Sequence, residues 1–295
     1  MALQILAYGG QKPVAFQKAI AQSPGFVALG DPMAQERAAL DFFALLNVSS
    51  LEEARQVDSR AIFEANARQI GYAPYLSPVF NIIVDGDFVP APPTVLLADG
   101  RHAQNVQVMV GHNANEAPSF APPFVNDDDS LRSWVAEDYP EVPESFVDTL
   151  LAVYPAIYDG SYPYSNGLER TWLIISEWIF TCSTNFINKA FDNRTYAYQF
   201  QVAPAFHAQD VAYTYYNGQG DDLETGLIAE IAEIQQAYIT NFIMHSDPNG
   251  PGLYPFPMQN GNASLNAWNA SGVHIQKDPT VNNRCVFWEE NLSQL

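Results

Sequence analysis

Two segments of the chain carry an acidic and a basic side chain that could work together. Glu116 closes the segment Gly-His-Asn-Ala-Asn-Glu at residues 111–116, and His207 lies in Ala-Phe-His-Ala-Gln-Asp at residues 205–210. An imidazole can take the proton of a nucleophilic hydroxyl, and a carboxylate can hold that imidazole in the required tautomer and stabilise its protonated form. Glu116 and His207 are therefore candidates for the acid and the base of an acyl-transfer site.

Neither residue carries this prediction alone, because most glutamates are exposed surface residues and the chain has five histidines. Their positions strengthen it. Residues 106–110 alternate toward a buried strand that ends before Glu116, and the aromatic run at 195–201 predicts a strand that ends before His207. Ligands of open α/β sheets bind outside the carboxyl ends of the strands. We therefore expect both side chains at that edge of a sheet.

The third part of such a site, a nucleophilic serine on a Gly-x-Ser-x-Gly turn, does not occur in the 295 residues. In α/β-hydrolases the order is serine, acid, histidine, so the serine should precede Glu116. Ser23 lies in Ala-Gln-Ser-Pro-Gly and has the right order. We reject it because the backbone N–H of the next residue helps form the oxyanion hole, and Pro24 has none.

The other elements alternate along the chain without an internal repeat, so we expect no domain boundary inside it. Helices are predicted at residues 1–8, 31–46, 59–69, 168–190, 225–245 and 282–292, a further strand at 18–22, and loops at 80–93 and 251–272. The acidic run at 126–130 is predicted to cap a helix. A calcium site there is the alternative, although its spacing fits no EF-hand loop.

Composition excludes several classes of partner. The formal net charge of -20 repels phosphate backbones and anionic lipid surfaces, which argues against nucleic acid as a partner. The chain has no run of eighteen or more apolar residues, so no transmembrane segment is predicted. With 47% hydrophobic residues, the chain can bury a sizeable core.

Five Asn-x-Ser/Thr sequences are candidate N-glycosylation sites, at Asn47, Asn193, Asn262, Asn269 and Asn291. One such sequence is weak evidence, since it arises by chance in Asn-rich proteins. Five of them, with only two cysteines that could pair, favour a secreted protein. Because the N-terminus lacks the basic start of a signal peptide, we expect that the targeting segment has been lost with residues upstream of Met1.

Several segments together resemble the type-B carboxylesterase family, the cholinesterase-like α/β-hydrolases that include secreted fungal lipases. The Gly-His-Asn-Ala-Asn-Glu segment is similar to the family's Gly-x-Asn-x-x-Glu, and His207 with Asp210 resembles its histidine loop. The other similar segments are Ala19-Ile20-Ala21-Gln22-Ser23, Val84-Asp85-Gly86, Pro90 through Gly100, Ser246-Asp247-Pro248-Asn249 and Cys285-Val286-Phe287-Trp288.

The resemblance implies an incomplete α/β-hydrolase fold, with residues 1–295 as the C-terminal portion of a single domain: a mostly parallel sheet flanked by helices. It implies a carboxylic-ester hydrolase with a Ser-Glu-His triad, in which this chain supplies Glu116 and His207, and the serine lies on an elbow upstream of Met1. The substrate would be a small-molecule or lipid ester, and no metal or organic cofactor is implied. One departure is Ala117-Pro118, where the family usually has glycine after the acid.

The resemblance also implies a disulfide between Cys182 and Cys285. The alternative for two cysteines is a pair of buried thiols, because cysteine is among the most buried residue types.

A second hypothesis belongs to another class of protein. A cholinesterase-like binding or adhesion module would keep the fold without the nucleophile, and it would not need to keep both Glu116 and His207. Their joint presence favours the enzyme. We also expect poor solubility of the chain by itself, because a sheet without its first strands has an unpaired edge.

Overall fold

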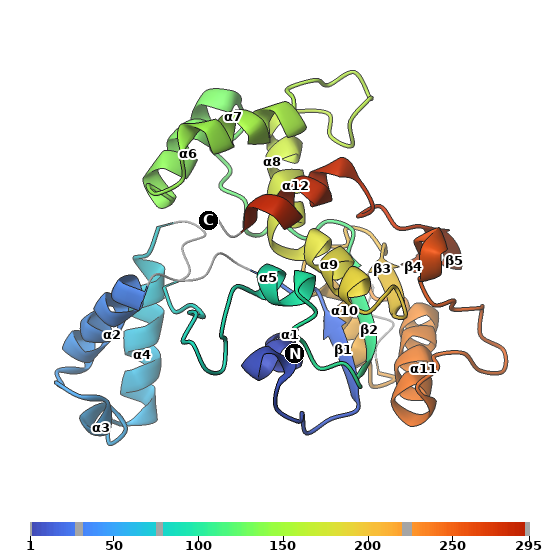
Figure 1. The fold of residues 1–295 in the computed structure, drawn as a ribbon, viewed down its shortest axis with the longest axis horizontal. Coiled ribbons are helices and arrows are strands. Elements are labelled where there is room, and N and C mark those ends of the chain that lie inside the picture. The colour runs from blue at the N-terminus through green and yellow to red at the C-terminus, as the bar shows by residue number, and fades with distance from the viewer. Residues whose placement is uncertain (1, 27–31, 75–78, 220–225, 293–295) are drawn as a thin grey trace.

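A five-stranded sheet forms the centre of the computed structural model, which describes residues 2–26, 32–74, 79–219 and 226–292 (Figure 1). The strands follow one another in chain order across the sheet. They are β1 Lys18–Gln22, β2 Gln107–Asn113, β3 Tyr196–Phe200, β4 Ser264–Asn269 and β5 Gly272–Lys277. Strands β1 to β4 are parallel and β5 is antiparallel to β4. The predicted mostly parallel sheet is confirmed.

Helices flank this sheet. They are α1 Ala2–Leu6, α2 Pro32–Leu46, α3 Leu51–Ala54, α4 Ser59–Gly71, α5 Pro93–Ala98, α6 Asp128–Asp138, α7 Glu144–Val153, α8 Gly167–Ile175, α9 Cys182–Ala190, α10 Gln209–Thr214, α11 Ala229–His245 and α12 Asn283–Asn291. Shorter turns are η1 Ala7–Gly10, η2 Ser176–Thr181 and η3 Asn260–Asn262. The predicted capping of α6 is confirmed, because Asp127 accepts the backbone N–H of Ser130 at 2.8 Å.

The two faces of the sheet are packed into separate cores. Along β2, Val108 and Val110 belong to one core, together with residues of α1, α5 and α9, whereas Met109 belongs to the other, together with residues of α11. This follows from the strand repeat, in which successive side chains point to opposite faces. Strand β2 is therefore buried on both sides, as is typical of parallel sheets between layers of helices.

The helices α2, α3 and α4 lie between β1 and β2 in the chain, and they project from the body of the molecule (Figure 1). Among the described residues of α2 no side chain is buried, and Phe63 of α4 is 70% exposed. The helices predicted at residues 31–46 and 59–69 are confirmed as α2 and α4, with Asp31 outside the described residues.

The loop predicted at residues 251–272 is wrong in its C-terminal part, which contains strand β4. Its sequence, Ser-Leu-Asn-Ala-Trp-Asn, is rich in turn-forming residues, yet the four central residues are buried. Pairing with β3 on one side and β5 on the other satisfies the backbone groups of the strand. Tertiary context therefore overrides the local preference of its asparagines.

The helical stretch predicted at residues 168–190 is confirmed. It consists of three consecutive segments, α8, η2 and α9, of which η2 is a π-helical turn. Cys182 at the start of α9 forms a disulfide with Cys285 of α12, with their Cα atoms 5.2 Å apart. The terminal helix predicted at residues 282–292 is confirmed as α12. The disulfide ties it to the helix that covers β2.

Candidate active site

Glu116 and His207 are in direct contact. The His207 Nδ1 atom lies 2.6 Å from Glu116 Oε2. The Glu116 side chain is fully buried, whereas the His207 side chain is 27% exposed. Glu116 follows β2 and His207 follows β3, and these strands are parallel neighbours. The pairing expected from the sequence is therefore present at the carboxyl edge of the sheet.

Backbone hydrogen bonds join the two loops that carry these residues. The N–H of Ala114 donates to the carbonyl of Phe200, and the N–H of Asn115 donates to that of Ala205, both at 2.9 Å. An isolated parallel bridge pairs Asn115 with Phe206. The ladder between β2 and β3 thus continues past the strand ends, and it holds the loops of Glu116 and His207 side by side.

The second carboxylate oxygen of Glu116 is also occupied. Glu116 Oε1 accepts the backbone N–H of Asn113 at 2.6 Å and the hydroxyl of Ser23 at 2.7 Å. These donors fix the carboxylate so that Oε2 faces the imidazole. A carboxylate is acceptor-only when ionised, so His207 donates its Nδ1–H to it. The Nε2 atom of His207 is then the one with a lone pair for a substrate-side proton.

Two aromatic rings hold the imidazole from the side. The ring centroid of Phe180, in η2, lies 4.4 Å from that of His207, and the centroid of Phe120 lies 5.0 Å away. Because rings packed at these distances restrict rotation of the side chain, the imidazole is held in the orientation that its contact with Glu116 requires.

The Ala117-Pro118 departure does not disturb the turn after the acid. Neither Glu116 nor Ala117 is among the described residues with a positive φ, so a glycine is not required at position 117. The Ala117 N–H donates to the Ser176 hydroxyl of η2 at 3.0 Å. This contact anchors the acid loop to the helical layer.

Ser23 lies on the carboxylate side of the pair. Its hydroxyl donates to Glu116 Oε1 and accepts from the Asn113 side chain at 3.3 Å. A nucleophile would instead need its hydroxyl on the imidazole, whose Nε2 is the base. The structure therefore supports the rejection of Ser23 as the nucleophile, and gives it a place in holding Glu116.

A sequence model of the Carboxylesterase family matches residues 4–288. The chain belongs to the carboxylesterase family. The carboxylesterase patB of Penicillium expansum is 35% identical over 290 residues, which are 98% of this chain and 51% of that protein. A protein named secreted lipase from Arthroderma benhamiae is 26% identical over 240 residues, 73% of this chain and 42% of that protein. The chain spans about half the length of these curated relatives.

Two solved structures share the fold of this chain. Aspergillus niger EstA superposes with a TM-score of 0.80 at 19% identity, over 99% of this chain and 62% of that chain. A structure titled PNB esterase superposes with a TM-score of 0.71 at 18% identity, over 97% of this chain and 60% of that chain. The predicted α/β-hydrolase fold is confirmed.

A buried polar network lies behind Glu116. Asp210 accepts from the Asn113 side chain at 3.2 Å, and from the Gln22 amide and the Tyr198 hydroxyl at 3.0 Å each. Tyr198 packs across Gly111, where an added Cβ would lie 2.2 Å from its ring. Gly111 is therefore required by the close approach of the tyrosine. The sequence showed Asn113 and Asp210 within the two motifs, but it did not show that they contact each other.

Some predicted features of the chain lie outside this site. Asn47 and Asn262 are exposed, and Asn193, Asn269 and Asn291 are half-buried. No group of three or more possible metal-binding side chains is present in the described part of the chain. Within the same residues, none of the helices has the length and apolar character needed to cross a membrane.

Replacing Asp210 by asparagine is expected to change how stability depends on pH. Burial raises the pKa of the Asp210 carboxyl above its ordinary value, while hydrogen bonds from Asn113 and Tyr198 partly oppose the shift. An acid with a raised folded-state pKa stabilises the fold below its unfolded pKa of about 3.9 and loses that contribution as the pH rises through the folded value.

Urea unfolding of both proteins between pH 4 and pH 7 measures this effect. The free energy of unfolding of Asp210→Asn should rise relative to the wild type as the pH increases above about 4, because only the wild type must ionise a buried carboxyl. Parallel curves for the two proteins would show that Asp210 does not titrate differently in the folded state.

Proposed function

We propose that this chain supplies the acid and the base of a carboxylic-ester hydrolase with a Ser-Glu-His triad. The 2.6 Å contact between His207 Nδ1 and Glu116 Oε2 carries the proposal. His207 Nε2 takes the proton of the serine hydroxyl as its oxygen attacks the ester carbonyl. The imidazolium returns that proton to the leaving alcohol as the ester C–O bond breaks. Water then cleaves the acyl-enzyme by the same two proton transfers, while Glu116 stabilises the imidazolium.

The serine belongs, in this proposal, to sequence upstream of Met1. Two observations support this placement: the 295 residues contain no Gly-x-Ser-x-Gly segment, and the match to carboxylesterase patB covers 51% of that protein. Residues 1–295 are then the C-terminal portion of a single α/β-hydrolase domain. By itself this portion would show no triad hydrolysis, because removal of the nucleophile leaves only residual catalysis.

The proposed substrate is a small-molecule or lipid ester, as the family implies, and the chemistry needs no metal or organic cofactor. The net charge of -20 argues against nucleic acid as a partner. We propose that the protein is secreted and glycosylated. The disulfide between Cys182 and Cys285 and the exposure of Asn47 and Asn262 support this location, since disulfides persist in oxidising compartments.

A non-catalytic binding or adhesion module of the same fold is the alternative. Glu116 is buried with three hydrogen-bond partners, Ser23, Asn113 and the His207 imidazole. Such an arrangement is costly to keep without a use, because a buried charge must be paired. This observation favours the enzyme.

Labelling with a fluorophosphonate, together with hydrolysis of a p-nitrophenyl ester, tests the proposal. We expect no labelling and no triad turnover for the 295-residue chain. A longer product of the same gene should contain an in-frame Gly-x-Ser-x-Gly, become labelled on that serine and hydrolyse the ester. Labelling of the short chain that disappears in Ser23→Ala would contradict the proposal and make Ser23 the nucleophile. An upstream stop codon or a substituted serine would favour the binding module.

A further inference from the structure

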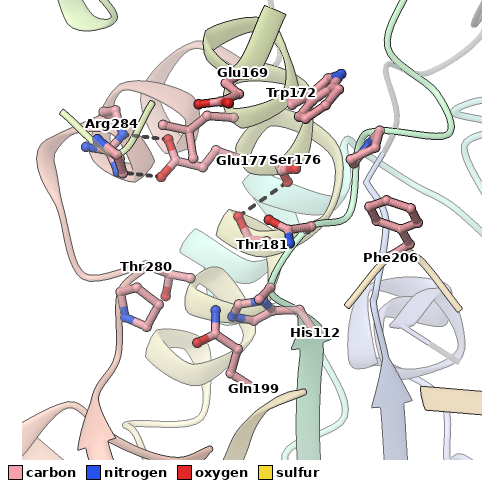
Figure 2. Close-up of a pocket in the computed structure, with 16 residues that line it drawn as sticks. His112, Glu169, Trp172, Ser176, Glu177, Thr181, Gln199, Phe206, Thr280 and Arg284 are labelled. Carbon is pink, nitrogen blue, oxygen red and sulfur yellow. Dashed lines mark hydrogen bonds and ion pairs between the residues drawn. The ribbon is translucent and has the colours of Figure 1, made fainter. Parts of the chain in front are cut away.

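A cavity of about 490 Å³ lies over the carboxyl ends of β2 and β3, against α8 and η2. Figure 2 shows aromatic side chains, Trp172 and Phe206, on one side of it and polar side chains on the other. This volume falls in the range of about 300–1,000 Å³ that is usual for small-molecule sites. Glu116 and His207 are not among its lining residues. The cavity is therefore separate from the acid–base pair.

The floor of the cavity contains an unpaired acceptor. His112 of β2 is 2% exposed, and its Nδ1 lies 2.9 Å from the carbonyl oxygen of Asn113. That nitrogen must donate, because the carbonyl only accepts, so Nε2 carries the lone pair of the neutral ring. Nε2 has no hydrogen-bond partner among the described residues. A buried acceptor without a donor costs free energy that a bound molecule could recover.

A donor lies next to this acceptor. Gln199 of β3 is the register partner of His112 on the adjacent parallel strand, so both side chains are on the same face of the sheet. Gln199 Oε1 accepts from Gln201 at 2.6 Å and from Gln276 at 2.8 Å. These bonds fix the amide, and its Nε2 has no acceptor within the described ranges. Figure 2 shows Gln199 beside His112 at the bottom of the cavity.

A hydroxyl group matches this pair, because it can donate one hydrogen bond and accept another at the same time. It would donate to His112 Nε2 and accept from Gln199 Nε2. A carboxylate could only accept and would leave His112 unpaired, and an ether has no hydrogen to donate.

The other residues of the cavity indicate which kind of molecule carries this hydroxyl group. Phe206 is 39% exposed. Its ring and that of Trp172 line the cavity and offer a surface for an aromatic molecule. Charge does not favour an ion. Arg284 already pairs with Glu177 at 2.7 Å and 2.8 Å, and the net charge of -20 repels anions.

We propose that this cavity binds an uncharged aromatic molecule with a hydroxyl group, seated on His112 and Gln199 with its ring against Trp172 and Phe206. The site does not depend on the proposed ester hydrolysis. It shares a wall with that chemistry, because Asn115 and Pro118 line the cavity and flank Glu116 in the chain.

Binding of three probes to the wild-type chain tests the proposal without any substitution. Phenol, anisole and benzoate are titrated separately, with saturation-transfer NMR as the readout. Phenol should bind with a dissociation constant of about 1 mM, as expected for a ligand of this size. Anisole, in which the hydroxyl hydrogen is replaced by methyl, should bind about fivefold to tenfold more weakly, and benzoate should not bind. Equal binding of phenol and anisole, or no binding of phenol, would overturn the proposal.

Two substitutions of His112 distinguish the roles of its two ring nitrogens. In His112→Asn the amide can replace the Nδ1 donor but not the Nε2 acceptor, so phenol should lose its advantage over anisole. In His112→Gln the amide oxygen reaches the Nε2 position, so part of the advantage should return. Unchanged discrimination in His112→Asn would contradict the assignment. Near-UV circular dichroism checks that each variant is folded.

The apolar wall has its own matched pair. Trp172→Ala should weaken the binding of phenol and of anisole to the same extent, because it removes the contact with the indole ring and leaves His112 and Gln199 intact. Phe63→Ala removes an exposed aromatic ring of α4, and it should change neither the dissociation constant of phenol nor that of anisole. If Phe63→Ala weakened phenol as much as Trp172→Ala, the probe would be binding to exposed rings rather than in the cavity.

Discussion

Replacing Glu116 by glutamine is expected to lower kcat for ester hydrolysis by about 10⁴-fold in the form of the enzyme that carries the nucleophile, as an asparagine does for the aspartate of the serine-protease triad. The carboxylate accepts from Asn113, Ser23 and the imidazole at once. An amide has only one acceptor oxygen. If that oxygen keeps the bonds of Asn113 and Ser23, the NH₂ group faces His207 and forces the proton onto Nε2. The imidazole can then no longer act as the base.

Steady-state kinetics of Glu116→Gln, His207→Ala and the double variant measure this effect. Because the residues act as a unit, the double variant should be little worse than His207→Ala alone. Glu289→Gln is a matched control, since this glutamate pairs with Lys189 on α9 and lies far from the acid in the chain. A loss of less than about tenfold in Glu116→Gln would show that the carboxylate does not orient the base.

Removal of the disulfide is expected to lower the free energy of unfolding by about 4–5 kcal/mol on the chain-entropy model. Cys182 and Cys285 are 103 residues apart, so their bond restricts a long loop in the unfolded chain. Alanine is the appropriate replacement at both positions, because the two side chains are buried and a serine would add an unsatisfied hydroxyl. Guanidinium unfolding of the Cys182→Ala/Cys285→Ala variant measures the loss.

The reduced wild type is the control for the disulfide. Reduction should destabilise the wild type by a similar amount, and it should leave the double alanine variant unchanged. A variant as stable as the oxidised wild type would show that packing of α12 against α9 suffices without the bond. A loss seen in the variant but not on reduction would assign the effect to the lost side-chain volume.

The sequence predicted most of the features that depend on local patterns. Strand alternation located β2 and β3, the acidic run at 126–130 located the start of α6, and the two motifs located Glu116 and His207 at strand ends. Since parallel strands bring their carboxyl ends to one edge, these positions predicted that both side chains lie at that edge, and the family resemblance predicted that they pair. Strand β4 was missed, because its asparagines favour turns and only its two neighbouring strands stabilise it.

The identity and order of the residues alone indicated the family and singled out Glu116 and His207 as the candidate acid and base of an acyl-transfer site. Only the tertiary structure decided which groups surround them: Ser23 on the carboxylate, Asp210 beneath Asn113, and His112 beside Gln199 at the floor of a cavity. The reason is that backbone period and turn chemistry act over a few residues. Hydrogen bonds between segments about 90 residues apart instead depend on how the strands pair.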